Sequence, residues 1–162
     1  MITGTPRDGI GPDPIGCSFV IPNRSIPQSS VIPELAYADV GAAADWLCEA
    51  FGFRIRLRIG QHRVQLVFGD GAMVATERDQ TTDGAPAAEV GTHSVLVRVD
   101  DVDRHHEHAR ASGARIHLPP TDYPYGERQY SAVDIGGHRW RFSQSIADVD
   151  PASWGATSID ID

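Results

Sequence analysis

The sequence predicts an α+β fold in which two tandem β-α-β-β-β modules form a curved mixed sheet with a concave ligand cleft. One observation is the repeated order of elements: a strand-like run, an amphipathic helix and three short strand-like runs. Another is spacing: the candidate N-caps Asp39 and Asp101 lie 62 residues apart, and the candidate helix stops Gly52 and Gly113 lie 61 apart. Because one helix covers only one face of a four-stranded sheet, the other face must be buried by a twin module, a second chain or a ligand.

The first module is predicted from hydrophobic periodicity. Apolar residues recur at helical spacing from Gly41 to Phe51, after the N-cap Asp39 and before the stop Gly52. One strand precedes this helix and three follow it, at residues 31–39, 53–59, 62–68 and 71–76. Gly69-Asp70-Gly71 predicts a tight hairpin turn before the last strand.

The second module repeats this order. It begins with a strand at 94–99 and a helix at 101–112, which stops at Gly113. The strands that follow are expected at 114–118, 128–133 and 138–143, with the last turn at Ile135-Gly136-Gly137. A β-α-β-β-β unit that occurs twice is hard to obtain by chance.

The composition of the flanking segments sets the expected domain organisation. Residues 1–30 are rich in Gly and Pro and predict an irregular N-terminal arm, and residues 145–162 predict an acidic tail, solvated or loosely docked. Between them we expect one domain at 31–144, with module one at 31–77, a polar linker at 78–92 and module two at 93–144.

The charge of the chain narrows the possible partners. All 14 basic residues are Arg and 22 residues are acidic, which gives a formal charge of -8 and argues against general nucleic-acid binding. No apolar run has the length of a membrane span, and Met1 to Ile15 lacks the pattern of a signal peptide, so we expect no membrane partner and a cytoplasmic location. Cys17 and Cys48 suggest neither a disulfide framework nor a cysteine zinc site, and no cofactor is indicated.

Strand alternation predicts which residues face the cleft. We expect Pro33, Leu35, Tyr37, the valines of strand 94–99, Trp140 and Phe142 to pack on the helices. The opposite face then receives Glu34, Ala36, Met73, Ala75, Leu96, Arg98, Arg139, Arg141 and Ser143. Arg98 and Arg141 could bind a carboxylate, enolate or phosphate, with Glu34 as base or acceptor. The alternative is a structural ion pair of Glu34 with Arg98 or Arg141.

The histidine cluster His105-His106-Glu107-His108 invites a metal interpretation, but no third ligand lies at a suitable spacing. On a helix His106 points with Val102 and Ala109 toward the core. A polar helix face with one half-buried histidine is therefore the expectation, and Cys48 is expected to be an inert core residue.

Several stretches resemble the vicinal-oxygen-chelate superfamily, the glyoxalase/bleomycin-resistance/extradiol-dioxygenase fold, and its uncharacterised glyoxalase-like members in particular. The resemblance covers about residues 31–144. The residues that carry it are Ile32 to Asp39, Trp46 to Phe53, Val99 to Asp103, Ala111 to Ala114, Tyr125-Gly126-Glu127-Arg128 and Asp134 to Phe142.

The resemblance implies further site residues. Tyr123, Tyr125, Arg128 and Tyr130 lie on the loop and strand that cover the pocket in relatives, and could line it or shape the turn. The strand of Arg54, Arg56 and Arg58 should be a sheet edge, where charges discourage pairing with other chains. Relatives commonly pair, so a homodimer is expected.

The family's enzymes usually hold one divalent metal at four positions, which correspond here to Ile32, Ala75, Ser94 and Arg141. Two of these side chains cannot ligate, and the guanidinium of Arg141 would repel a cation. A shift by one residue would replace Ser94 with His93, which alone makes no metal site. We therefore expect no metal and a protein of the bleomycin-resistance type that binds a small molecule.

Two enzymatic alternatives stay open, so whether the protein is an enzyme is not decided by its sequence. One is a metal-independent lyase or isomerase that uses Glu34 as base and Arg98 and Arg141 as anion binders. The other is a metal-dependent enzyme with displaced ligands such as His93 and Glu34. The expected ligand-contact residues are Glu34, Met73, Leu96, Arg98, Tyr125, Arg128, Tyr130, Arg139 and Arg141.

Overall fold

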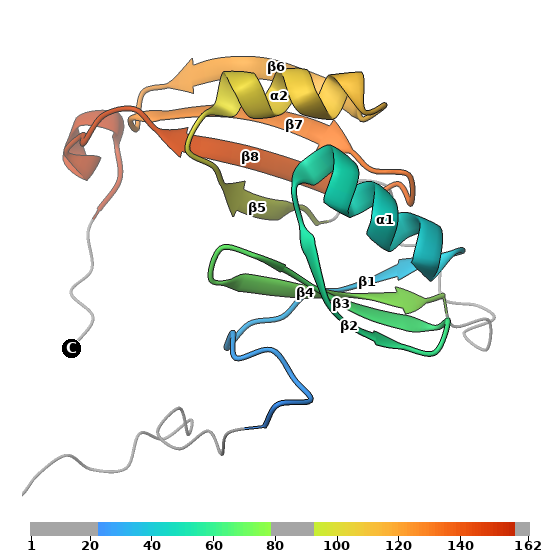
Figure 1. Cartoon of the computed structure of the whole chain (residues 1–162). Coiled ribbons are helices and arrows are strands. Elements are labelled where there is room, and N and C mark those ends of the chain that lie inside the picture. The colour runs from blue at the N-terminus through green and yellow to red at the C-terminus, as the bar shows by residue number, and fades with distance from the viewer. Residues whose placement is uncertain (1–22, 79–92, 158–162) are drawn as a thin grey trace, which may run out of the picture.

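A computed structural model describes residues 23–78 and 93–157 of the chain. In this part the chain forms two four-stranded mixed sheets, each with one α-helix on one face, as Figure 1 shows. The predicted α+β tandem of β-α-β-β-β modules is thereby confirmed. We call the face of each sheet that carries no helix its open face.

The first sheet is built by module one. Its elements are β1 (Glu34–Tyr37), α1 (Val40–Phe51), β2 (Arg54–Ile59), β3 (Arg63–Phe68) and β4 (Gly71–Glu77). The strand order is β1-β4-β3-β2, with β1 parallel to β4 and the other pairs antiparallel. The arginine-rich strand β2 therefore lies at the sheet edge, as predicted.

The second sheet repeats this topology. It consists of β5 (Val95–Arg98), α2 (Val102–Ala111), β6 (Arg115–Tyr123), β7 (Glu127–Val133) and β8 (Arg139–Ser145), in the order β5-β8-β7-β6. A short 3-10 helix, η1 (Pro151–Trp154), follows in the segment predicted as an acidic tail.

The helices begin at the predicted caps. The Asp39 side chain accepts a hydrogen bond from the Ala42 backbone N–H at 2.9 Å, and Asp101 accepts one from Arg104 at the same distance. Gly52 ends α1 with φ 78°, a left-handed conformation in which glycine carries no steric penalty.

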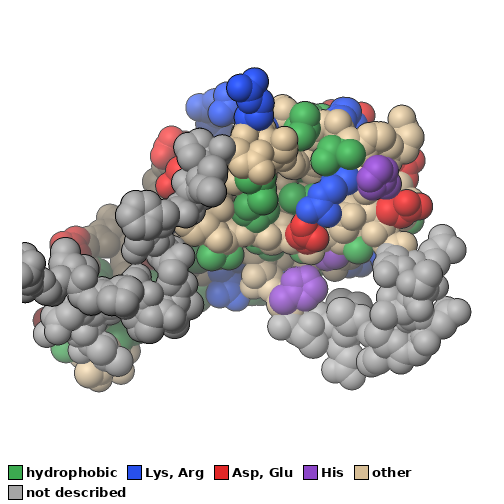
Figure 2. Space-filling model, turned by 90° about the horizontal axis from the view of Figure 1, so that it is seen from below, with side chains coloured by type: hydrophobic (Ala, Val, Ile, Leu, Met, Phe, Trp, Pro, Cys, Tyr) green, Lys and Arg blue, Asp and Glu red, His purple; other side chains and the backbone are tan. Residues whose placement is uncertain are grey.

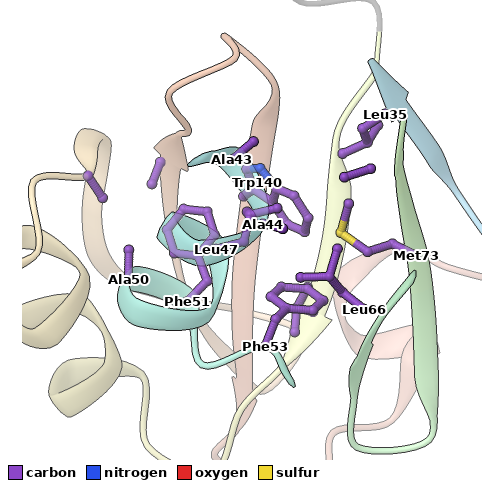
Figure 3. Close-up of a cluster of buried hydrophobic side chains, with 14 of the residues drawn as sticks. Leu35, Ala43, Ala44, Leu47, Ala50, Phe51, Phe53, Leu66, Met73 and Trp140 are labelled. Atoms are coloured by element: carbon purple, nitrogen blue, oxygen red, sulfur yellow. The ribbon is translucent and has the colours of Figure 1, made fainter. Parts of the chain in front are cut away.

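One hydrophobic core joins the two modules. The Phe51 ring of α1 lies 4.9 Å from that of Phe142 on β8, and Phe53 lies 5.5 Å from Trp140. Figure 3 shows the Trp140 ring among side chains of α1 and of the first sheet, with Phe53 and Leu66 close by. Because helix-bearing faces supply this core, both open faces point away from it.

A buried carboxylate also links the modules. Asp134 Oδ2 accepts hydrogen bonds from the Tyr37 hydroxyl at 2.7 Å and from Trp140 Nε1 at 2.9 Å. Its other oxygen accepts the backbone N–H groups of Gly136 and His138, both at 2.9 Å. Burial and the Asp134 carboxylate together raise the pKa of Tyr37, so the phenol stays a hydrogen-bond donor.

Strands β6 and β8 extend beyond their predicted ends. β6 runs to Tyr123 instead of Leu118 and passes through Pro119 and Pro120, which an irregular edge strand tolerates because one side needs no ladder hydrogen bonds. The tail docks on the β6–β7 turn, where the Gly126 carbonyl accepts the N–H groups of Ile146 and Ala147.

Candidate functional site

The open face of the second sheet collects most of the predicted ligand residues. Leu96 pairs in register with Arg141, and Arg98 pairs with Ser143, so these side chains share one face. Arg139 lies two residues before Arg141 on β8, so its side chain is on the same face. Leu96 and Arg98 are well exposed, with 57% of the Leu96 residue accessible.

A hollow on this face extends from the residues just before β5 across β8 and β7 to β6. It has a volume of about 320 Å³ and is lined by His93, Ser94, His117, Leu118, Ser131, Ala132, Arg139, Trp140 and Arg141. We call it the cationic hollow, because two arginines and two histidines reach it and none of its lining residues is acidic. Ser131 Oγ, which is buried, has no hydrogen-bond partner in the described residues.

A polar cluster of Glu127, Gln129 and Ser143 lies further along the same face. Ser143 Oγ and Gln129 Nε2 both donate to Glu127 Oε2 at 2.6 Å. The hydrogen bond from Ser143, then that from Gln129 and the charge of Arg98, lower the pKa of Glu127 against the effect of burial. Glu127 is therefore an ionised acceptor and a weak base.

This cluster was not predicted from the sequence, because assigning the two faces of β7 requires the strand pairing. Glu127 and Gln129 alternate with Arg128 and Tyr130 on β7, so fixing which set faces the helix assigns the other set to the open face. Tyr130 pairs in register with Phe142, a core residue, and that pairing gives the answer.

Three predicted contact residues lie on the helix side instead of the open face. Met73, Arg128 and Tyr130 were expected to line the cleft, and this placement was wrong. Met73 pairs with Leu66 and is 2% exposed, because its strand alternates in the opposite sense to the prediction. The same correction applies to Ala75, which pairs with Leu35 in the core.

Arg128 and Tyr130 are engaged with α2. Arg128 holds both carboxylate oxygens of Asp103 at 2.9 Å and also donates to Asp122 at 2.6 Å. The Tyr130 hydroxyl lies 2.7 Å from His105 Nδ1, whose other ring nitrogen lies 3.1 Å from the Phe51 carbonyl oxygen. His105, rather than His106, is thus the histidine whose ring is held by hydrogen bonds to core residues.

Tyr125, in the β6–β7 turn, stacks on Tyr123 and contacts the docked tail. Its ring lies 5.2 Å from that of Tyr123 and 5.5 Å from that of Trp154. Its hydroxyl is 3.4 Å from Gln129 Oε1, so Tyr125 borders the polar cluster. The aromatic group closes one end of the open face of the second sheet.

Glu34 lies on the other sheet and forms an ion pair with Arg63 of β3. The sequence predicted Arg98 or Arg141 as its partner, and this prediction was wrong. Both residues of the pair are partly exposed. Seen from below, apolar side chains gather beside opposite charges on the face that the first sheet presents (Figure 2).

Part of the predicted arm covers this first sheet. The Gln65 side chain, 4% exposed as a residue, donates to the Ser25 carbonyl at 2.9 Å, and Arg56 donates to the Arg24 carbonyl at 2.7 Å. Ser29 Oγ donates to the Asp70 carbonyl at 2.8 Å. Residues 1–22, with Cys17, and the linker residues 79–92 lie outside the described residues.

The positions where the resemblance implies metal ligands do not fit a metal. Glu34 pairs with Val74, as its repeat counterpart Leu96 pairs with Arg141, so the position equivalent to Arg141 is Val74 and not Ala75. Isoleucine, valine, serine and arginine offer no set of donors for a divalent ion. Within residues 23–78 and 93–157, no three His, Cys, Asp or Glu side chains come together as a metal site would require.

A second, apolar groove of about 460 Å³ follows the unpaired side of β5 toward β4. Met73 borders it, together with Phe53, Val97 and Trp140. None of the described helices is long and apolar enough to cross a membrane.

Comparisons with known proteins agree with this architecture. Residues 31–142 match the family model of the Glyoxalase/Bleomycin resistance protein/Dioxygenase superfamily. The crystal structure of TioX from Micromonospora sp. ML1 is 37% identical, with 75% of this chain and 100% of that chain covered and a TM-score of 0.58. A comparison with curated proteins finds no match.

Two less similar structures share the fold. A hypothetical protein, SA1046 from S. aureus, is 21% identical over 74% of this chain and 94% of its own, with a TM-score of 0.60. A glyoxalase-related enzyme from Fulvimarina pelagi is 20% identical over 72% of this chain and 88% of its own, with a TM-score of 0.59. The chain belongs to the Glyoxalase/Bleomycin resistance protein/Dioxygenase superfamily.

Proposed function

We propose that the protein binds a compact small molecule without a metal ion, in the manner of the bleomycin-resistance members of its family. The observation that carries this proposal is the residue set at the four ligand positions, Ile32, Val74, Ser94 and Arg141, in which the last supplies a fixed positive charge. The guanidinium of Arg141 repels a cation at this position.

The open face of the second sheet supports the binding role. Its cationic hollow lies beside a polar cluster of hydrogen-bonded side chains, and Leu96 adds exposed apolar surface between strands. A few fixed polar groups around a hollow are typical of small-molecule sites. We infer that Leu96, Arg98, Tyr125, Arg139 and Arg141 contact the ligand.

The lyase or isomerase alternative has less support. Its candidate base, Glu34, is paired with Arg63 on the first sheet, whereas Arg98 and Arg141 lie on the second. Glu127 lies closer to these arginines, but its lowered pKa makes it a poor proton acceptor.

Metal analysis and ligand recovery test the proposal together. We expect the purified full chain to hold less than a stoichiometric amount of any divalent metal, and mass spectrometry to recover a bound molecule unchanged after incubation. A stoichiometric metal, or conversion of the molecule into a product, would contradict it. If conversion is seen, Glu34→Gln and Glu127→Gln, each with Glu49→Gln as an exposed control, identify the base.

A further inference from the structure

The two arginines of the cationic hollow have no carboxylate partner among the described residues. Arg58, Arg63 and Arg128 each form a close ion pair with a carboxylate. Arg139 and Arg141 form none with any described residue, although they lie on one face of the same strand. Because one residue lies between them along the strand, their Cα atoms are about 7 Å apart.

Two neighbouring guanidiniums repel each other unless an anion lies between them. Such like-charge neighbours on one sheet face are destabilising. The usual remedy, a nearby carboxylate, is not among the residues that line the hollow. Arg139 is only partly exposed, so water screens its charge less than that of a side chain on the open surface.

A buried hydroxyl adds a second, independent observation. Ser131 pairs in register with Arg141, so both project from the open face. Ser131 Oγ is buried and has no hydrogen-bond partner in the described residues, which costs free energy unless a ligand atom or water meets it. Ser94, just before β5, and His117, on β6, bring further donor groups to the same hollow.

We propose that the cationic hollow is an oxyanion site that takes the carboxylate or phosphate group of a small organic ligand. Guanidiniums of Arg139 and Arg141 would hold the oxygens, and the Ser131 hydroxyl would donate to one of them. Leu118, 46% exposed, offers apolar contact to the ligand body. This inference rests on the proposed function and specifies the class of ligand.

Nuclear magnetic resonance titration of the full chain tests the proposal. The probes are benzoate, phenyl phosphate and inorganic phosphate at millimolar concentrations, with neutral benzamide as the isostere without charge. We expect the amides of Ser131, His117 and Arg141 to shift with the anions and not with benzamide. Comparison of benzoate with phenyl phosphate then distinguishes a carboxylate ligand from a phosphate.

Matched variants locate the anion. Arg139→Gln and Arg141→Gln should each weaken binding about tenfold, because each removes one charged donor pair. Arg54→Gln on the exposed edge strand β2 makes the same change in net charge and should leave binding unchanged. Ser131→Ala should weaken binding several-fold without loss of stability, since it removes a hydroxyl that has no partner in the fold.

Three results would overturn the proposal: equal binding of benzamide and benzoate, equal loss in Arg54→Gln and Arg141→Gln, or no shift at these amides with any anion. The last outcome leaves the binding role itself standing if a neutral molecule still binds unchanged. Conversely, a ligand that depends on Arg141 but is converted into a product retains the oxyanion site and refutes the binding role.

Discussion

Asp134 satisfies four hydrogen-bond donors with one buried carboxylate. The donors are the Tyr37 hydroxyl, the Trp140 indole and the backbone N–H groups of Gly136 and His138. Such fully paired networks define one arrangement of a core, because loss of any acceptor leaves several donors buried without a partner.

Asp134→Asn should therefore be strongly destabilising. The amide places N–H groups opposite the donors of Tyr37 or Trp140, and we expect a loss of about 3 kcal/mol in the free energy of unfolding. Urea denaturation followed by fluorescence measures it, with Asp148→Asn in the exposed tail as control. Equal midpoints for the two variants would show that the network contributes little.

His105 should make stability depend on pH. Burial, followed by the nearby His108 charge, lowers its pKa in the folded chain despite the hydrogen bond to Phe51, so the folded state holds the neutral ring. The unfolded chain then takes up a proton first as pH falls. The contribution of His105 to stability is complete above the ordinary histidine pKa and is lost as the pH falls through that pKa toward the lower pKa of the folded chain.

Denaturation across this range provides the measurement. His105→Gln should flatten the pH dependence, while His62→Gln, at an exposed turn, should leave it as it is. An unchanged slope in His105→Gln would assign the dependence to other histidines.

At the scale of elements, the helices could be predicted closely and the strand faces could not. Asp39 and Asp101 cap locally, so their signals lie within a few neighbouring residues. Which side of β4 or β7 faces the core depends on pairing with distant strands, and both strands carry small or polar residues on the two sides. For this reason the sequence assigned Met73 and Tyr130 to the wrong faces of their strands.

The same limit applies to the candidate site. Leu96, Arg98, Arg139 and Arg141 could be placed together because Trp140 and Phe142 mark the core side of β8 clearly. Glu127 and Gln129 could not, since β7 shows no comparably apolar set. The partner of Glu34 was also out of reach, because the pairing of β3 with β4 brings in Arg63.

A side chain at Gly126 should prevent the tail from docking on the turn between β6 and β7. Its φ is 81°, and a Cβ atom would collide with the Ala147 carbonyl of the docked tail. Gly126→Ala should therefore release residues 146–157, seen as faster amide hydrogen exchange there. Gly69→Ala, with φ 56° and no neighbour within 4 Å of the added atom, is the control and should leave the tail protected.

In the part of the chain that the structure describes, the two open sheet faces cannot cover each other, because the shared core lies on the helix sides. A ligand enclosed by two modules therefore needs a second chain to supply the other wall. This supports the homodimer that the family resemblance implies.

Sedimentation should then give twice the 17.5 kDa mass of the chain. We expect the dimer at micromolar concentrations and little change with dilution, as for an interface that buries sheet faces. A single-chain mass across this range would instead mean that the cationic hollow works in an isolated chain.

The hydrogen bond between Tyr37 and Asp134 also gives the two modules different roles. The repeat places Val99 where the first module has Tyr37, and valine has no hydroxyl to offer. Two copies of the second module would leave the Asp134 carboxylate short of a donor, and two copies of the first would leave the phenol without its acceptor. The two modules of this chain are therefore not interchangeable, because one supplies the donor of this hydrogen bond and the other its acceptor.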